Sequence, residues 1–597
     1  MPKGDHPLAK RFRSAIGAVQ AGWWHAGLRP PRLSAEDLAK YRKHDPAAGW
    51  RFEYPFSDRS RRIDVIVSAG FPSVPARIAV VDRPRFLTWP HVENDGVLCL
   101  VPDHATFSVD DPYAGVAVLL DKAIKLIEGF VRGEHEDDFK SEFLTYWDHA
   151  KKGTEGTVLS LVEPAPPSRT IRVWEGRSHI VLADDDGQLQ RWLKNFNSAL
   201  SSADMVSRGG VLAWLETPLL PSQYPKAAKD VYALAADAGV ADLLLEGLSR
   251  EVPPRLFVAL GASTEHGPAI ATTVISRPAI VRGGDPLAKG FRPSRVPEHV
   301  VLSRLFGGDP AGRLPVERVD PTWVHGRAQD PRIATLRGAT VALLGCGSVG
   351  APVALSLARA GVAKLILVDQ QSLTGANVGR HILGVRSISY PKASELAKRI
   401  RADLPHVEVE HHIAKVQDLL VRSDGPLEHV DLIVSALGDW PAESLLDEWH
   451  QANGRPFPIV YGWTEPHATA GHAVILSSSG GSLRDGLNET GEPDVVATHW
   501  PEETRRYEPA CGAAFEPYGP VELGFITSLI AQAALDGLLG TIGPSTHRMW
   551  LARRAFVEAA GGSWSEMLRE IAPQALEGGM MVERQWGLRP AGKVLAA

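Results

Sequence analysis

A glycine-rich turn is the first feature of this 597-residue chain that could carry chemistry. Residues 345–350 read GCGSVG, which has the GxGxxG spacing, and they follow an apolar run at 339–344. A helix is expected at 351–360, and a second strand at 364–369 ends in Asp369. In such a strand–turn–helix–strand unit the glycines let the backbone approach phosphate, and the acid can bind ribose hydroxyls. The turn therefore predicts a nucleotide site.

The charged residues that follow this turn favour ATP over a dinucleotide. Asn377 and Arg380 stand in N-x-x-R spacing, Lys392 follows, and the apolar run at 430–439 ends in Asp439. A dehydrogenase needs no cations beside the phosphates and no second acid for a metal. Cleavage between the α- and β-phosphates of ATP needs cations to neutralise developing charge and a carboxylate to hold Mg²⁺. A non-catalytic NAD-binding scaffold stays open as the weaker alternative.

With these motifs, residues 320–597 resemble the ThiF/ubiquitin-activating (E1) adenylation family. The resemblance implies a Rossmann-like domain that uses ATP and Mg²⁺. It implies that Asp369 binds ribose, that Asn377 and Arg380 contact phosphates, that Lys392 stabilises the transition state and that Asp439 holds Mg²⁺. The complete ATP site implied in this way is Gly345, Gly347, Gly350, Asp369, Asn377, Arg380, Lys392 and Asp439.

The same resemblance implies two further properties of this domain. The family is dimeric, and an arginine before the first strand reaches the partner's ATP; Arg327 and Arg332 are both candidates, and the spacing does not choose between them. The paired CxxC zinc motifs of the family are missing from this chain, so we expect no zinc.

Two of the three cysteines stand in this part of the chain. Cys511 lies in YEPACGAAFEPY at 507–518, on a proline- and glycine-flanked stretch before an apolar helix, where a thiol is expected to be accessible and its thiolate favoured. In activating enzymes a crossover loop here carries the cysteine that attacks the acyl-adenylate, and the resemblance implies this role for Cys511. Cys346, inside the glycine-rich turn, is interpreted as a small buried residue without chemistry.

The third cysteine, Cys99, lies near the other end of the chain in TWPHVENDGVLCL at 88–100. This run resembles the active-site signature of ubiquitin-conjugating (E2) domains, and the resemblance implies that Cys99 accepts an acyl group. The usual His-Pro-Asn triplet aligns with Trp89, Pro90 and His91. Whether His91 replaces the asparagine functionally stays open at this point, as does the alternative of a turn followed by a buried cysteine.

Two histidines, His467 and His472, follow the nucleotide motifs. Five residues separate them and no third ligand stands nearby, so a metal site is disfavoured. We expect them to line the loop or strand near the adenylate. His472 can be read as an aid to Cys511 or as a structural residue.

Two breaks divide the chain into candidate domains. A proline-rich stretch lies at 163–168, and a Gly-, Pro- and Asp-rich stretch lies at 307–322. We therefore predict an α/β multidomain protein with an N-terminal α+β ubiquitin-conjugating-like domain at 1–160. An α/β linker domain of unknown role is predicted at 161–319, and a Rossmann-like ThiF adenylation domain at 320–597.

Composition narrows the functional classes. The formal net charge of −6 disfavours nucleic acid and a polybasic membrane anchor, and three distant cysteines disfavour a disulfide framework. The start of the sequence lacks the apolar core of a signal peptide, and the apolar stretch at 525–543 is interrupted by Gln532 and Asp536, as in a buried helix. We expect a cytoplasmic protein with no nucleic-acid or membrane partner.

The order of the domains suggests a relay on one chain. It is similar to the E2–E1 fusion proteins of bacterial CBASS anti-phage operons, which implies that a protein C-terminal carboxylate is adenylated, passed to Cys511, then to Cys99, and then to a target lysine. In that group the activated C-terminus belongs to a cGAS-like nucleotidyltransferase. A separate bacterial ubiquitin-like protein is the alternative substrate, and a ThiF-type adenylyltransferase without conjugation is the alternative enzyme.

Overall fold

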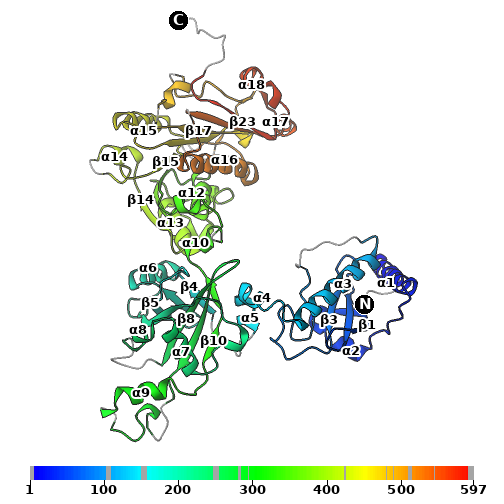
Figure 1. Ribbon diagram of the computed structural model, residues 1–597. Coiled ribbons are helices and arrows are strands. Elements are labelled where there is room, and N and C mark those ends of the chain that lie inside the picture. Colours follow the sequence, from blue (N-terminus) through cyan, green and yellow to red (C-terminus); the bar gives the residue numbers. More distant parts are fainter. Residues whose placement is uncertain are drawn as a thin grey trace. The chain divides into compact units, whose positions relative to one another are not determined.

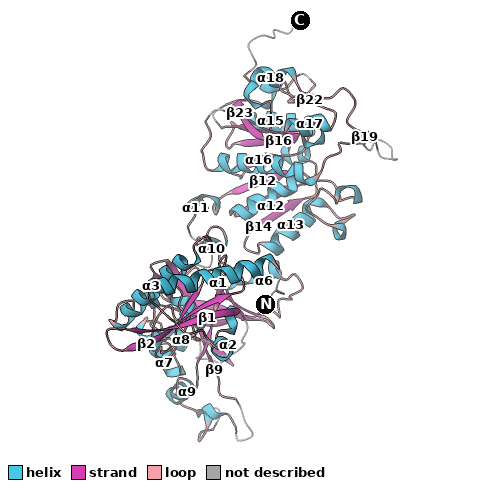
Figure 2. Ribbon diagram, turned by 90° about the vertical axis from the view of Figure 1, so that its right-hand side faces the viewer, coloured by secondary structure: helices cyan, strands magenta, loops and turns pink. Residues whose placement is uncertain are grey.

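The computed structural model describes twelve stretches of the chain: residues 6–101, 109–149, 157–246, 254–279, 284–292, 295–327, 329–422, 425–478, 480–488, 490–507, 514–543 and 545–588. The chain forms two compact units, drawn as ribbons in Figures 1 and 2. The first comprises 1–159, 164–180 and 208–317, and the second 160–163, 181–207 and 318–597. This division into two units does not test the three domains predicted at 1–160, 161–319 and 320–597, which stay a prediction. Cys511 lies outside the described residues.

The first unit begins with a three-stranded antiparallel meander covered by helices (Figure 1). Alternate residues of the meander point to one core, where Trp23 meets Trp50 edge-to-face with ring centroids 4.7 Å apart. Asp111 caps the covering helix α3 by accepting from the N–H of Ala114 at 2.9 Å. This is the α+β arrangement predicted for the N-terminal segment. Its elements are α1 (Pro7–His25), α2 (Ala35–Ala39), η1 (Arg42–His44), β1 (Pro46–Pro55), β2 (Ser60–Ser68), β3 (Arg77–Val80) and α3 (Pro112–Val131).

A second sheet includes, within this unit, strands in the order β10-β9-β8-β7-β5. Strand β8 pairs in parallel with β7 and antiparallel with β9, and long runs of both β8 and β9 are buried. Helices α4 and α5 contribute aromatic side chains to its core. The elements are α4 (Asp138–Ser141), α5 (Phe143–His149), β5 (Arg169–Glu175), β7 (Arg208–Trp214), α7 (Ala228–Asp237), α8 (Ala241–Glu246), β8 (Arg255–Thr264), β9 (Gly267–Ser276), α9 (Glu298–Leu305) and β10 (Gly312–Leu314). Strands β4 (Thr157–Ser160), β6 (His179–Ala183) and β11 (Val316–Arg318) lie where the chain passes between the units.

The second unit is built on an eight-stranded sheet with the order β14-β13-β12-β15-β16-β17-β21-β23. Pairing is parallel from β14 to β16 and antiparallel from β16 to β23. Helices α12, α13 and α16 pack in the core on one face, and α14 and α15 in the core on the other. This doubly wound arrangement confirms the Rossmann-like fold predicted for the C-terminal segment. The sheet strands are β12 (Thr340–Leu344), β13 (Lys364–Val368), β14 (Glu408–His412), β15 (Leu432–Ser435), β16 (Ile459–Thr464), β17 (Ala470–Leu476), β21 (Thr546–Leu551) and β23 (Met580–Gln585).

Helices α12 and α13 of this unit begin at Gly350 and Lys392, two residues predicted for the nucleotide site. The helices of the unit are α6 (Asp186–Phe196), α10 (Pro321–Val324), α11 (Ile333–Leu336), α12 (Gly350–Ala360), α13 (Lys392–Asp403), α14 (Val416–Leu420), α15 (Trp440–Ala452), α16 (Pro520–Leu538), α17 (Arg554–Ala559) and α18 (Glu566–Ile571). Helix α16 is long and apolar enough to cross a membrane by length and composition. Its side chains Ile526, Ile530 and Ala533 are nevertheless fully buried against the sheet, so it is a core helix, as the polar interruptions predicted.

Candidate active site

The glycine-rich turn connects β12 to α12, and two of its glycines are required by packing. Gly345 has a φ of +90°, and a Cβ there would lie 2.7 Å from the carbonyl oxygen of Ala436. A Cβ at Gly350 would lie 1.9 Å from the carbonyl oxygen of Gly345. Around Gly347 a Cβ would meet no atom of the described residues within 4 Å, so among these residues the glycine leaves open space. The turn is therefore tight at both ends and accessible in the middle, as phosphate binding requires.

A cavity of about 150 Å³ lies at the carboxyl ends of the parallel strands. It lies where strand order reverses about β12, which is the place where open α/β sheets bind ligands. Five residues predicted for the ATP site line this one cavity: Gly345, Gly347, Asp369, Lys392 and Asp439. They come from four separate segments of the chain, and the fold brings them together.

Asp369 directly follows β13 and lies against the glycine-rich turn. One carboxylate oxygen accepts from the N–H of Cys346 at 2.8 Å, and the other accepts from the N–H of Gln371 at 2.7 Å. The carboxylate is thus held against the glycine-rich turn at the edge of the cavity. This is the position expected for an acid that receives ribose hydroxyls.

Lys392 begins α13 and is only 6% exposed. Its Nζ donates to the Gln371 side-chain oxygen at 2.8 Å. An amide does not neutralise an ammonium, so the positive charge of Lys392 stays available to an anion in the cavity it lines.

Asn377 and Arg380 are not among the residues that line the cavity. The Asn377 side chain accepts from the Thr374 hydroxyl at 2.9 Å and holds the 3₁₀ turn η5 (Gly375–Asn377). The Arg380 guanidinium lies over the ring of Tyr518, 5.2 Å from its centroid. Their predicted contacts to phosphate stay predictions.

His381 was not predicted from the sequence, and its side chain forms a hydrogen bond with the glycine-rich turn. Its Nε2 lies 2.8 Å from the carbonyl oxygen of Cys346, and its Nδ1 accepts from the N–H of Leu383 at 3.1 Å. Because Nδ1 accepts, Nε2 carries the proton and donates to the turn. Burial lowers the pKa of His381 and favours this neutral form. Cys346 is buried, as predicted, and burial raises the pKa of its thiol.

Asp439 caps α15, and its carboxylate accepts from the N–H of Ala442 at 3.3 Å. One turn further, Glu443 accepts from the Ser435 hydroxyl at 2.8 Å. Burial raises the pKa of Glu443 to about 7, and the nearby Asp439 charge adds to the shift. Glu443 was also missed from the sequence, although D-x-x-x-E spacing on a helix places two acids on one face.

His472 belongs to a buried polar cluster rather than to the cavity. It is 0% exposed, its Nε2 donates to Glu465 at 2.8 Å, and its Nδ1 lies 2.9 Å from Nε2 of His547. Glu465 also accepts from the N–H groups of Ala497 and Thr498 at 2.6 and 2.8 Å. These contacts favour the structural reading of His472. The other histidine, His467, lies outside this cluster, its ring 4.9 Å from that of Trp500.

The two arginine candidates for a role across a dimer lie outside the cavity of their own chain. Arg332 forms an ion pair with Asp330, with Nη2 2.7 Å from the carboxylate. Arg327 is exposed, on a backbone with a φ of +54°. The choice between them stays a prediction.

In the first unit, Cys99 lies exposed after a pinned turn. Gly96 has a φ of +94°, and a Cβ there would lie 2.5 Å from the carbonyl oxygen of Val80. Val92 and Leu98 form a bridge, and the N–H of Cys99 donates to the carbonyl of His91 at 2.9 Å. The buried-cysteine alternative is therefore wrong, because the turn places this thiol at the surface.

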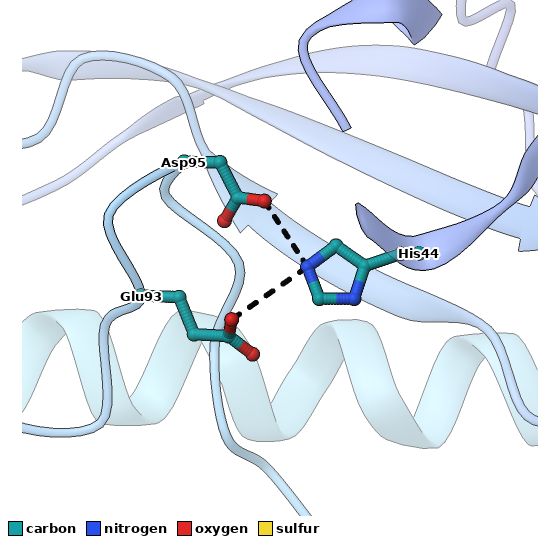
Figure 3. Close-up of side chains that lie close together, drawn as sticks. All are labelled: His44, Glu93 and Asp95. Carbon is teal, nitrogen blue, oxygen red and sulfur yellow. Dashed lines mark hydrogen bonds and ion pairs between the residues drawn. The ribbon is translucent and has the colours of Figure 1, made fainter. Parts of the chain in front are cut away.

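Three side chains, His44, Glu93 and Asp95, connect this turn to η1 (Figure 3). Nε2 of His44 lies 3.1 Å from Asp95 and 3.7 Å from Glu93. The three groups could hold a metal ion, since their ligand atoms lie within 4.8 Å of one another. Lys43 also pairs with Glu93. Glu93 and Asp95 thus have partners within the chain, in Lys43 and His44, without a metal ion. These contacts attach the turn that leads to Cys99 to η1.

Comparison with known proteins agrees with the description of the Rossmann-like domain and with that of the N-terminal domain. Residues 325–559 match the model of the ThiF family, and residues 24–154 match the model of prokaryotic E2 family B. The chain is 22% identical over 546 residues to "ATP-dependent ubiquitin transferase-like protein Cap2" of Pseudomonas aeruginosa, covering 85% of this chain and 91% of that protein. It is 26% identical over 214 residues to "Ubiquitin-like modifier-activating enzyme 5" of Drosophila persimilis, covering 34% of this chain and 53% of that protein.

Solved structures with partial likeness to the chain include Escherichia coli MccB with ATP. That match has 14% identity and a TM-score of 0.29, and covers 44% of this chain and 69% of the MccB chain. PaaA is a second example, with 16% identity and a TM-score of 0.28, covering 37% of this chain and 62% of the PaaA chain.

Proposed function

We propose that this chain, which is an E2–E1 fusion with a prokaryotic E2 family B domain ahead of a ThiF domain, activates a protein C-terminus with ATP and conjugates it to a target amine. The motif-based prediction of an ATP-dependent conjugating enzyme is confirmed by the two family matches and by the Cap2 relative. The observation that carries the proposal is the shared cavity of Gly345, Gly347, Asp369, Lys392 and Asp439.

The first step joins a carboxylate to AMP in this cavity. A carboxylate oxygen of the substrate attacks the α-phosphorus of ATP, an acyl-adenylate forms, and pyrophosphate leaves. Gly347 leaves room for phosphate beside the backbone N–H groups, and Lys392 supplies positive charge to the transferring group. Asp439 would hold Mg²⁺ on the leaving phosphates, since a strand-end carboxylate is a ligand that Mg²⁺ prefers. We expect no zinc.

The next two steps are thioester exchanges. The Cys511 thiolate attacks the acyl carbon, a thioester forms, and AMP leaves. Cys99 then attacks that thioester, the acyl group moves to its sulfur, and Cys511 is released as a thiolate. The exposed position of Cys99 suits this exchange. Because Cys99 and Cys511 belong to one chain, the effective concentration of each thiol near the other is raised.

The substrate is proposed from the resemblance to CBASS fusion proteins. There the activated C-terminus belongs to a cGAS-like nucleotidyltransferase, which becomes attached to target lysines in anti-phage defence. A bacterial ubiquitin-like protein is the alternative substrate, and adenylation without conjugation is the alternative reaction. We further propose a homodimer through the ThiF domain, with Arg327 or Arg332 reaching the partner's ATP, in the cytoplasm and without nucleic acid or membrane.

Pyrophosphate exchange into ATP, measured with a candidate protein substrate, tests the activation step. Exchange should depend on the substrate's C-terminal residue and should be lost in Lys392→Ala. Cys511→Ala should keep exchange and lose every thioester, whereas Cys99→Ala should trap the acyl group on Cys511. Tight NAD binding with no exchange for any C-terminal substrate would overturn the proposal, and normal conjugation by Cys99→Ala would overturn the relay.

A further inference from the structure

Helices α4 and α5 belong to the core of the second sheet of the first unit. Phe139, Phe143 and Trp147 are buried with residues of β7, β8 and β9. The indole N–H of Trp147 donates to the carbonyl of Leu314 at 3.1 Å, and its ring packs on Tyr224 at 5.1 Å. These helices are therefore anchored in the core of the second sheet.

Helices α4 and α5, together with Glu142 between them, reach His91 with three polar groups. Nε2 of His91 lies 3.1 Å from the Asp138 carboxylate, and Nδ1 lies 3.6 Å from the Glu142 carboxylate. The backbone N–H of His91 donates to the Tyr146 hydroxyl at 2.9 Å, and that hydroxyl donates to Glu142 at 3.0 Å. Asp138 is also bonded by His135 at 3.0 Å. Ring and backbone of His91 are thus both held.

His91 in turn contacts the reactive cysteine. The N–H of Cys99 donates to the carbonyl of His91, so the two residues are joined across the turn. The φ of His91 is +54°, a left-handed conformation that costs free energy for a non-glycine residue. The bond from its N–H to Tyr146 stabilises that conformation. Burial raises the pKa of Tyr146 and the negative charges of Glu142 and Cys99 add to the shift, so its hydroxyl stays protonated.

We propose that α4 and α5 complete the conjugating site: Nδ1 of His91, which is left without a hydrogen bond among the described residues when Nε2 donates to Asp138, accepts the proton of the attacking amine, while Asp138 and Tyr146 are positioning residues that hold the ring and the backbone of His91. The inference rests on the proposed function, and it assigns a role to the second sheet. A lysine ammonium gives one proton to His91, and the free amine attacks the thioester carbonyl. The C–N bond forms, the C–S bond breaks, and the second nitrogen proton goes to the Cys99 thiolate. Asp138 fixes the orientation of the imidazole through its hydrogen bond with Nε2, which is the part given to it.

The test uses the full chain with a preformed Cys99 thioester and free L-lysine as the acceptor. Single-turnover discharge is measured against lysine concentration, after subtraction of hydrolysis without lysine. His91→Ala should slow the maximal rate about 100-fold, the lower range for loss of a general base. Asp138→Asn and Tyr146→Phe should each slow it about tenfold, with the half-saturating lysine concentration unchanged. Asp138→Glu should restore part of the rate.

The chain supplies matched controls for both positioning residues. Tyr224→Phe removes a hydroxyl from the same aromatic core, and that hydroxyl has no hydrogen-bond partner within the described part of the chain. Asp137→Asn neutralises the neighbouring acid, which is exposed and pairs with Lys140. Both controls should discharge like the wild type. If Tyr146→Phe fails to fold, the partly exposed Asp138 decides the matter.

Two results would be decisive against the inference. Discharge by Asp138→Asn at the wild-type rate would overturn it while leaving the proposed function intact. A wild-type chain that never forms a Cys99 thioester would overturn the proposed function, and this inference with it.

Discussion

The hydroxyl of Tyr518 lies 2.9 Å from the hydroxyl of Ser348, in the middle of the glycine-rich turn. The guanidinium of Arg380 lies over the same tyrosine ring. Tyr518 is seven residues beyond Cys511 in the sequence. One side chain therefore connects the turn, the predicted phosphate-binding arginine and the chain segment that leads from the proposed nucleophile. The second unit thereby connects the proposed adenylation site to the segment that follows the proposed nucleophile.

Replacing Tyr518 tests this connection. Tyr518→Phe keeps the ring beneath Arg380 and removes only the hydroxyl, so we expect the KM for ATP in pyrophosphate exchange to rise about fivefold, as for loss of one hydrogen bond. Tyr518→Leu removes the ring as well, and we expect a larger rise because Arg380 loses its contact. Tyr507→Phe is the control, since that hydroxyl is exposed and bonds to Glu503. Equal KM values for Tyr518→Phe and the wild type would contradict the connection.

Asp439→Asn separates the charge of this residue from its structural role. Asparagine caps a helix about as well as aspartate, so the bond to Ala442 and the melting temperature should be preserved. The lost charge should reduce exchange about 100-fold at low Mg²⁺, and added Mg²⁺ should restore part of it. Asp431→Asn is the control, because that carboxylate bonds the N–H of Thr340. Full activity of Asp439→Asn at low Mg²⁺ would exclude Asp439 as a metal ligand.

Glu443 predicts a pH dependence of stability. Its pKa is raised from 4.5 to about 7, so the folded protein retains a proton that the unfolded chain releases. The stability from this group is complete below pH 4.5 and declines as pH rises to about 7. Glu443→Gln keeps an acceptor for Ser435 without this titration.

The measurement compares unfolding free energies of the two proteins in denaturant at pH 5 and pH 8. The variant should gain stability relative to the wild type with rising pH, by at most about 3 kcal/mol. A difference that does not change between the two pH values would mean that Glu443 titrates normally. Glu448→Gln, at an exposed acid on the same helix, should show no such change.

The parts of the site that follow a local pattern could be predicted from the sequence. The GxGxxG turn, Asp369 and Asp439 each come directly after an apolar strand, and the ends of parallel strands meet at one edge of a sheet. The fold class followed from the same alternation of strands and helices. His381 could not be found in this way, because its bond to Cys346 joins residues 35 positions apart.

The site around Cys99 illustrates the same limit. The sequence motif identified His91 as the residue at the usual asparagine position, but Asp138 and Tyr146 carry no motif and lie 47 and 55 positions away. They reach His91 only because Phe143 and Trp147 are buried in the second sheet's core. Long-range packing of this kind leaves no local signal in the chain.

The last prediction concerns Glu465, a buried acid in the connection between β16 and β17. Burial alone would raise the pKa of Glu465, but the bonds from His472 and Thr498 outweigh it and hold the pKa below its usual value. Glu465→Gln puts an amide N–H₂ among these donors. We expect the unfolding free energy at pH 7 to fall by about 3 kcal/mol, the cost of breaking a buried network.

The sign of the pH effect makes this prediction specific. A carboxylate with a lowered folded pKa contributes stability above its unfolded value of 4.5, and the contribution is lost as pH falls through the folded pKa. The difference in unfolding free energy between the wild type and Glu465→Gln should therefore become smaller below pH 4.5, as measured by denaturant unfolding. Glu492→Gln changes an exposed acid of the same unit and should cost less than about 0.5 kcal/mol. A Glu465→Gln protein as stable as that control at pH 7 would show that the cluster of Glu465, His472 and His547 contributes nothing to the fold.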